Sequence, residues 1–385
     1  MKQFIYADNA ATTKLDIDAF EAMKPYLLED YGNASQPYFF AKKPKLALQA
    51  ARRTIAACIG ALPEEIYFTS GGTESDNWAI KCFGSRNDVR RVITSQIEHH
   101  AVLHACEALQ VDVKDYLPVD GQGIVSVEML SKRLETYNKP VPSCLSTLVS
   151  VMLVNNEIGT IEPIKELSAV AHAHGALFHT DAVQAVGHIP INVNELGVDM
   201  LSASAHKFNG PKGIGFLYVR KGTHISPYAD GGAQEHGMRA GTENVPGIVG
   251  MATALKKNCE VMKQTAEKLC AMERVFLDCL HMADVDFIRN GAENRTLGNI
   301  SISIRGTSGE MLLHRLDLKG IAISTGSACD SVNTQVSHVI KAIGVPREYA
   351  EGTIRISLGK ENTEDEARMI AEAIIQVLKP AEPQK

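Results

Sequence analysis

The eight cysteines of this 385-residue chain include no Cys-x-x-Cys pair. That spacing is typical of zinc ribbons and of thioredoxin-like redox sites, so both kinds of site are disfavoured. The chain also lacks an apolar run near the ~18–20 residues that a membrane helix needs. Its first residues contain no apolar stretch typical of a secretory signal. The sequence therefore predicts a cytoplasmic protein without a membrane span, whose thiols are reduced rather than paired.

Positive charge and proline are scarce as well. Lys and Arg total 39 against 45 Asp and Glu, which gives a formal net charge of −6. A nucleic-acid binder should instead show a basic excess, so we expect no nucleic-acid partner. Fifteen Pro and 30 Gly, spread along the chain, exclude collagen-like and low-complexity classes. We expect no metal site, because His172 and His174 stand two apart on a predicted helix and do not share a face.

Short apolar runs alternate with helical patterns between residues 64 and 220. This alternation predicts an α/β fold with a mostly parallel sheet covered on both faces. Such sheets bind ligands beyond the carboxyl ends of their strands. The predicted strands are Ile66–Thr69, Val89–Thr94, Val111–Leu117, Leu145–Val154, Ala176–His179, Met200–Ser204 and Gly215–Val219. The helical patterns between them include Ala101–Leu109, Val127–Leu134 and Lys165–Ala173.

A helical pattern without Gly or Pro runs from Met251 to His281. It is longer than a typical globular helix and predicts a connection between two domains. The elements predicted after it are strands at Asn299–Ile304 and Thr353–Leu358, a helix at Glu310–Leu318, and a last helix opened by a capping box at Thr363. We expect a large domain over residues 15–255 and a smaller α+β domain built from residues 1–14 and 256–385.

Polar groups stand where three predicted strands end. Gly71 and Gly72 follow one strand and open a helix, where backbone N–H groups can bind a phosphate. An ordinary Gly-rich turn explains them equally well, and no Walker A lysine follows. Asp181 fits an N-cap, a metal ligand, a base or the partner of a pyridinium nitrogen. Lys207 is either a surface lysine or a candidate Schiff-base lysine. Together they match the needs of pyridoxal phosphate, namely an amine, a carboxylate and an anchored phosphate.

Over essentially its whole length the chain resembles the class V, fold-type I enzymes that depend on pyridoxal phosphate. Within them it is most similar to cysteine desulfurases of the NifS/IscS type. The resemblance implies a large domain with a mostly parallel seven-stranded sheet. The motifs that carry it are Asp8–Thr13, Ser70–Asn77, Glu98–Val102, Val154–Gly159, His179–Gln184, Ser204–Gly213, Gly237–Asn244, Ser327–Cys329 and Ile354–Gly359. Nine collinear motifs are far more specific than any one of them.

The resemblance implies roles around the cofactor ring. Lys207 would hold pyridoxal phosphate covalently and take part in proton transfer. Asp181 would pair with the ring nitrogen, and His99 would stack on the ring and move protons. Gln184 would bind the phenolic oxygen. The other implied cofactor ligands are Gly72, Thr73, Asn156, Ser204, His206 and, from the second subunit of a homodimer, Thr242.

The resemblance also implies how the substrate, L-cysteine, is used. Arg355 would capture its carboxylate, helped by Asn156 and Asn33. Cys329, which stands in a polar, Gly-containing stretch, would attack the substrate sulfur and leave alanine and a persulfide. A sulfur-acceptor protein, for iron–sulfur cluster assembly or another thiolation pathway, would then take the sulfur. The alternatives are a selenocysteine lyase or another class V aminotransferase, and a sulfur-transfer scaffold without catalysis.

Several residues depart from the family pattern, among them Ala34, where Pro is usual, and Gln335-Val336, which replace a usual Glu-Pro. Tyr38 stands where these enzymes commonly have His, and His236 replaces a usual Arg. Asp330 follows the proposed nucleophile, where its carboxylate should disfavour a thiolate. Pro44 interrupts a helix expected there, which predicts a reshaped or disordered stretch.

Overall fold

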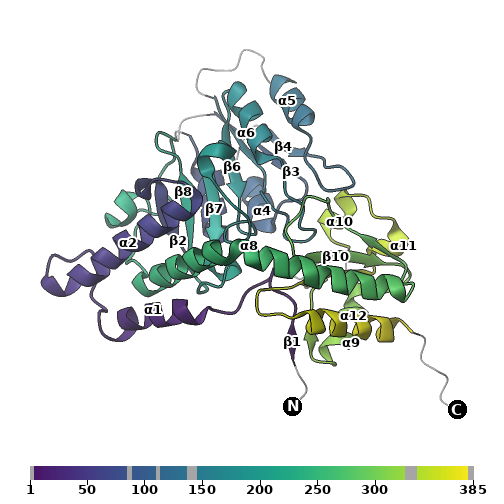
Figure 1. Cartoon of the computed structure of the whole chain (residues 1–385). Helices are drawn as coiled ribbons and strands as arrows, with labels where there is room; N and C mark the ends of the chain where they lie inside the picture. Colours follow the sequence, from purple (N-terminus) through teal and green to yellow (C-terminus); the bar gives the residue numbers. More distant parts are fainter. Residues whose placement is uncertain (1–3, 85–88, 110–112, 137–144, 326–335, 380–385) are drawn as a thin grey trace.

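A computed structural model describes residues 4–84, 89–109, 113–136, 145–325 and 336–379 of the chain. The larger part of the molecule is a sheet flanked by helices, and a smaller part carries a second sheet (Figure 1). The long helix α8 (Val245–Met282) runs along both parts. In the described ranges no helix is both long and apolar enough to cross a membrane.

Seven strands form the large sheet within the described residues. In sheet order they are β2 (Ile66–Thr69), β8 (Gly215–Val219), β7 (Met200–Ser204), β6 (Leu177–Asp181), β5 (Leu145–Ser150), β3 (Val89–Ser95) and β4 (Val113–Leu117). Strand β8 is antiparallel to both of its neighbours, and the other pairs are parallel. The predicted mostly parallel sheet is therefore confirmed, and β2, β6 and β7 end at the same edge.

Both faces of the large sheet are buried. Adjacent residues of one strand pack into two different apolar cores, one on each face. Val92 packs with an apolar cluster that includes Trp78, while its neighbour Ile93 packs with the cluster on the opposite face. Period-2 alternation of the side chains produces this division. The helices around this sheet are α1 (Ile17–Leu28), α2 (Lys42–Ile59), α3 (Gly72–Cys82), α4 (His100–Ala108), α5 (Val127–Thr136), α6 (Ile164–Ala173) and α7 (Val193–Leu196).

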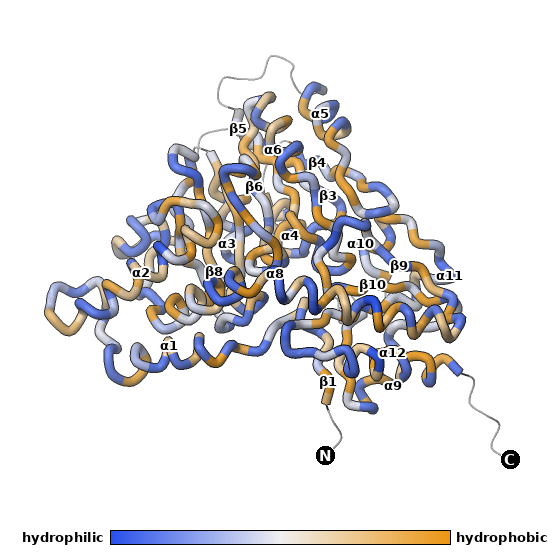
Figure 2. Tube along the Cα trace, in the orientation of Figure 1, coloured by the Kyte–Doolittle hydropathy of each residue, from blue (hydrophilic) through white to orange (hydrophobic). Residues whose placement is uncertain are grey.

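The outer helices bury one face each. In Figure 2 the tube of α2, α5 and α12 alternates between hydrophilic and hydrophobic colours, which is typical of amphipathic helices. Pro44 does not disrupt α2, so the predicted reshaping is wrong. The helix begins at Lys42, which places Pro44 in the first turn, where the missing N–H has no partner to lose.

The smaller part has its own core. Antiparallel strands β9 (Phe287–Arg289), β10 (Asn299–Ile304) and β12 (Thr353–Ser357) form one sheet, and β1 (Ile5–Tyr6) pairs in parallel with β11 (Ile321–Ala322). Helices α9 (Gly309–Asp317), α11 (Arg347–Ala350) and α12 (Glu364–Leu378) complete it. Along α8, Leu255 belongs to the large core and Leu269 to the small one. On this basis we propose the domain division at residues 14/15 and 255/256.

Helix α10 (His338–Ala342) joins the two parts. Its Val339 and Ile340 pack with Ile97 and Ile158, which belong to loops at the edge of the large sheet. The strand predicted over Leu145–Val154 is shorter than expected, since its ladder ends at Ser150 and the chain continues as a buried loop. That loop and α10 both lie beside the site described next.

Candidate active site

A cavity of about 450 Å³ lies where β2, β6 and β7 end. This is the position at which open α/β sheets bind ligands, and the volume suits a small ligand. The structure brings together nine of the predicted site residues in its lining: Gly72, Thr73, His99, Asn156, Asp181, Gln184, Ser204, His206 and Lys207. Met152, Thr12 and Lys212, which the sequence did not single out, line it as well.

The N-terminus of α3 opens onto this cavity. Gly71 has a φ of 151°, which favours glycine, and its Cβ would lie 3.5 Å from Ser204 Oγ. A Cβ on Gly72 would lie 2.6 Å from Val183 Cγ2, so a larger residue would fill the gap beside β7. The first N–H groups of a helix have no carbonyl partner within it, and the helix dipole adds positive potential. This corner can therefore hold a phosphate.

His206 lies beside that corner, in the short turn that follows β7. Its Nδ1 is 3.1 Å from Thr12 Oγ1. Burial, reinforced by the charge of Lys207, lowers the pKa of His206 to about 4, so the ring is neutral at pH 7. A neutral imidazole can donate one hydrogen bond without bringing a second charge next to Lys207.

Lys207 points toward the N-terminal segment. Its Nζ donates to the carbonyl oxygens of Ala10 at 2.7 Å and Ala11 at 2.9 Å. Gln184 Nε2 donates to the same Ala10 oxygen at 2.8 Å. The segment that follows β1 therefore closes the cavity on the side of the amine, and it links the two parts of the molecule at this point.

His99 caps α4 and faces the cavity. Its Nδ1 accepts from the N–H of Ala101 at 3.1 Å, so in the neutral ring the proton is on Nε2. Burial, reinforced by the charge of the neighbouring Lys207, lowers the pKa of His99 to about 4. His99 is thus a neutral imidazole at pH 7, with one N–H available for the cavity.

Buried carboxyls surround the end of β6. Asp181 Oδ1 accepts from Val183 N at 2.9 Å, and burial raises the pKa of Asp181 to about 6. Asp76 on α3 is 1% exposed, and its Oδ1 has no hydrogen-bond partner among the described residues. Burial raises the pKa of Asp76 well above its usual range, and the charge of Asp181 raises it further. Desolvated carboxyls of this kind are typical of functional sites.

Asp76 and His179 were missed by the sequence interpretation. Asp76 follows Gly72 by one helical turn, so the motif and the 3.6-residue period together place it beside the same cavity. His179 is fully buried between Ser150 Oγ at 2.8 Å and Ser202 Oγ at 3.0 Å. Burial lowers the pKa of His179 to about 3, and its Nε2 lies 3.7 Å from Asp76 Oδ1. The buried surroundings of Asp76 are therefore polar, and His179 within them is uncharged at pH 7.

The buried groups set the pH dependence of stability for the cofactor-free protein. Burial raises the pKa values of Glu98 and Glu162 to about 8. A group with a raised pKa binds its proton more tightly in the folded state, so stability is lost as pH rises toward 8. Histidines with lowered pKa values, such as His99 and His179, make the folded protein more stable as pH rises, but only up to the ordinary histidine pKa of ~6.5. Above that pH they add no further change.

We therefore expect the free energy of unfolding to fall between pH 6.5 and 8. Each carboxyl contributes a slope of up to about 1.4 kcal/mol per pH unit. Urea unfolding at stepped pH measures the slope, and Glu162→Gln should reduce it. Glu166→Gln, an exposed control on α6, should leave it unchanged. A free energy that rises with pH in this window would contradict the assignment.

Arg355 lies one contact away from the cavity. Its side chain is 5% exposed and donates to Asn156 O at 2.9 Å and to Asp8 Oδ1 at 2.7 Å. Its Nε is buried and has no hydrogen-bond partner among the described residues. The guanidinium therefore keeps N–H donors, including Nε–H, that are unpaired among the described residues. Asp8, which the sequence did not single out beyond its motif, fixes its orientation.

Besides Arg355, two predicted residues of the described chain, Asn33 and Thr242, are not in the cavity lining. Asn33 accepts from Ser35 N at 3.0 Å, in the loop between α1 and α2. Thr242 is exposed and lies in a separate depression beside Ser70. Cys329 lies outside the described residues, as does Asp330. Described residues on either side of that stretch contact neighbours of the cavity residues: Ser324 pairs through its backbone with Arg355, and His338 Nε2 lies 3.0 Å from Glu98 O.

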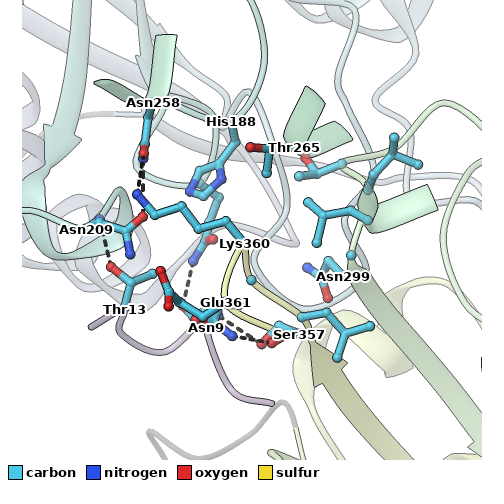
Figure 3. Close-up of a pocket in the computed structure, with 18 of the residues that line it drawn as sticks. Asn9, Thr13, His188, Asn209, Asn258, Thr265, Asn299, Ser357, Lys360 and Glu361 are labelled. Carbon is cyan, nitrogen blue, oxygen red and sulfur yellow. Dashed lines mark hydrogen bonds between the residues drawn. The ribbon is translucent and has the colours of Figure 1, made fainter. Parts of the chain in front are cut away.

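A smaller cavity of about 80 Å³ lies next to the first, between the two parts of the molecule (Figure 3). Lys360 crosses it and donates to Asn258 Oδ1 at 3.1 Å, while Asn258 Nδ2 donates to Phe208 O at 3.0 Å. Lys360 also donates to Asp16 at 2.9 Å. This network connects the turn that carries Lys207 to α8 and to the loop after β12.

Comparison with known proteins gives the class of the chain. The family model described as Aminotransferase class-V matches residues 5–370, so the chain belongs to that family. A cysteine desulfurase IscS from Dictyoglomus turgidum is 47% identical over 394 residues, covering 100% of this chain and 98% of that protein. A structure named NIFS-like protein matches with a TM-score of 0.88 and 37% identity, over 98% of this chain and 99% of that one.

A structure of SspA in complex with cysteine also matches, with a TM-score of 0.78 and 33% identity over 92% of this chain and 99% of that one. Within the class V family, the chain is thus similar to cysteine desulfurases of the NifS/IscS type. The resemblance read from the nine motifs is confirmed, and the fold is fold type I.

The class V family and its fold are, as a kind, dependent on pyridoxal phosphate. The residues present fit that group. The corner at Gly72 would be filled by any Cβ, as a phosphate cradle requires. Asp181 is buried, and among the described residues its carboxyl accepts a hydrogen bond from Val183 N and from no cationic side chain, which suits a protonated ring nitrogen. Lys207 lines the same cavity and offers the amine.

Proposed function

We propose that the protein binds pyridoxal 5′-phosphate and converts L-cysteine to L-alanine, with the sulfur carried away as a persulfide on Cys329. The observation that carries the proposal is the convergence of Lys207, Asp181, His99 and the α3 N-terminus on one cavity. Lys207 holds the cofactor, and Asp181 keeps its ring nitrogen protonated. Gly72, Thr73, Ser204 and His206 bind the phosphate, while Gln184 and Asn156 contact the ring.

The cofactor, when bound, supplies the electron sink that lets bonds at the substrate α- and β-carbons break. Arg355 binds the substrate carboxylate through the guanidinium that Asp8 orients, and Asn156 and Asn33 assist. Lys207 and neutral His99 move protons at the substrate. The Cys329 thiolate would attack the substrate sulfur, and the carbon–sulfur bond of the substrate would break with its electron pair left on carbon. Protonation of that carbon would give alanine, and the sulfur would remain on Cys329 as a persulfide.

We also propose a homodimer in which Thr242 of one copy completes the phosphate site of the other. Two observations support it. Thr242 is exposed and outside its own cavity. Large apolar side chains are exposed around the α1–α2 loop, among them Leu28 at 68%, Tyr31 at 69% and Phe39 at 87%, and a surface of this kind is typical of an interface. A sulfur-acceptor protein and a cytoplasmic location complete the proposal.

Product analysis tests the activity. The holoenzyme with L-cysteine and a thiol reductant should release alanine and sulfide in equal amounts. Without reductant, the peptide that bears Cys329 should gain the mass of one sulfur atom. Amino transfer to a 2-oxo acid, with no turnover of cysteine, would instead favour the alternative of another class V aminotransferase. Turnover of selenocysteine alone would favour a selenocysteine lyase.

A further inference from the structure

A carboxylate stands at the corner where the phosphate is proposed to bind. Glu74 lies in the first turn of α3 and lines the cavity that contains Lys207. Its side chain is 11% exposed, and its Oε2 accepts from Ser70 N at 3.1 Å. A carboxylate at this position favours the helix itself, because the helix N-terminus carries positive potential. It disfavours a phosphate, because two negative charges would then share one helix N-terminus.

Arg239 neutralises this carboxylate. Its Nε donates to Glu74 Oε1 at 2.9 Å and its Nη2 donates to Glu74 Oε2 at 3.2 Å, so the two side chains form a bidentate pair. Burial acts to raise the pKa of Glu74, but the hydrogen bonds from Arg239 and Ser70 hold that pKa below its usual value. Glu74 is therefore ionised at pH 7, and the pair as a whole carries no net charge.

The backbone that leads to Arg239 is held in an unusual conformation. Glu235 and His236 have φ values of 46° and 60°, in the left-handed region that residues other than glycine rarely adopt. The Glu235 carboxylate accepts from Arg52 at 2.7 and 2.8 Å and from Phe68 N at 3.0 Å. Strained backbone of this kind persists where its surroundings fix it, and it is typical of functional sites. The fold therefore sets the place of the Arg239 guanidinium.

Arg239 also lies beside Thr242. A depression of about 70 Å³ is lined by both residues, and it adjoins the active-site cavity because Ser70 and Gly213 line both spaces. Among the described residues that line the depression, Arg239 is the only cation, and the other charged side chains are carboxylates. Loss of Arg239 would therefore leave uncompensated negative charge on this side of the α3 N-terminus.

We propose that Arg239 sets the preference of the site for a phosphorylated cofactor by neutralising Glu74 at the N-terminus of α3. This role rests on the proposed function, which places the phosphate at that helix. With Arg239 present, the helix N–H groups face the phosphate without a competing negative charge. Without Arg239, the Glu74 carboxylate repels the phosphate, while the parts of the site that hold the ring are unaffected. Arg239 acts through Glu74 and is thus a positioning residue.

Two ligands separate this role from a merely structural one. Pyridoxal 5′-phosphate and pyridoxal, which lacks the phosphate, are titrated into the cofactor-free, full-length protein. In Arg239→Gln we expect the affinity for pyridoxal 5′-phosphate to fall about 10–100-fold, the effect of one uncompensated like charge nearby. The affinity for pyridoxal should not change. The double variant Glu74→Gln/Arg239→Gln, which removes both charges, should restore the affinity for pyridoxal 5′-phosphate.

Two further variants complete the test. Glu74→Gln alone should keep or strengthen the preference for the phosphorylated ligand, since the glutamine Oε1 can still accept from Ser70 N. Arg305→Gln, which breaks an exposed ion pair with Glu348 in the smaller part of the molecule, is the control and should change neither affinity.

Equal losses for both ligands in Arg239→Gln, or no rescue in the double variant, would overturn the role of Arg239. A weaker preference in Glu74→Gln would overturn it as well, without any change at Arg239. If instead the unchanged chain binds the two ligands equally, the phosphate corner itself is wrong, and the proposed function falls together with this role.

Discussion

Replacing Lys207 with alanine should abolish covalent attachment of the cofactor and lower the rate of alanine and sulfide formation by at least about 10²–10⁴-fold. That range is the usual contribution of a positioned acid–base group alone, and the loss of the covalent anchor adds to it. The reason is positional. Lys207 lines the cavity beside Asp181 and His99, and its Nζ is held by the carbonyls of Ala10 and Ala11.

Lys212 provides the matched control, since it lines the same cavity but is exposed. Borohydride reduction followed by peptide mapping measures the attachment, because it leaves a stable pyridoxyl group on the lysine that held the cofactor. The label should appear on Lys207 in the unchanged chain and in Lys212→Ala, and on no lysine in Lys207→Ala. A label on Lys212 in the unchanged chain would contradict the assignment.

Six of the seven strands of the large sheet could be predicted to within two residues at each end, because buried strands read as continuous apolar runs. Asp181, Ser204 and Lys207 stand directly at or after such runs, and the topology rule for parallel sheets then brings them together. Gly72, Asp181 and Lys207, which the strand ends indicated, line one cavity together with six residues that only the family resemblance implied. Asp76 lies one helical turn after Gly72 on α3, so the 3.6-residue repeat of the helix would have placed it beside the same cavity.

Contacts between distant segments could not be predicted in this way. Asp8 orients Arg355 across 347 positions of sequence, and Ala10 receives bonds from both Gln184 and Lys207. No local pattern encodes these pairings, since they arise from how β1 and β12 dock against the large sheet. Pro44 shows that a local feature can also be misjudged when the start of a helix is not known. Its effect depends on where α2 begins, and a shift of one turn decides between a broken helix and a tolerated first-turn residue.

Asp181→Asn should stabilise the cofactor-free protein and weaken the holoenzyme. Burial raises the pKa of Asp181 from 3.8 to about 6. The folded state therefore binds the proton more tightly than the unfolded state, and stability is lost as pH rises from ~4 to ~6. Above that window the buried charge costs up to about 3 kcal/mol. Asparagine is nearly isosteric and uncharged, and its Oδ1 can still accept from Val183 N, so much of this cost should disappear.

With cofactor bound, the sign reverses. On the proposed function, the carboxylate of Asp181 would then pair with a protonated ring nitrogen, and the amide of asparagine could not balance that charge. Cysteine turnover should fall on the order of 10²-fold, the usual loss when one preorganised electrostatic contact is removed. Urea unfolding of both forms between pH 4 and 8, together with cofactor titration, measures the two effects on one variant.

Asp199→Asn is the matched control. Asp199 is also a buried carboxylate beside β6, but it accepts from Phe178 N at 2.7 Å and contacts His172 at 2.8 Å, away from the cavity. The Asp199→Asn substitution should destabilise the cofactor-free and cofactor-bound forms equally and leave cofactor affinity unchanged. If Asp181→Asn also lowers both forms equally, Asp181 is a structural carboxylate rather than the partner of the ring nitrogen. Opposite shifts in the two forms are the signature of a charge that the fold keeps buried for its ligand.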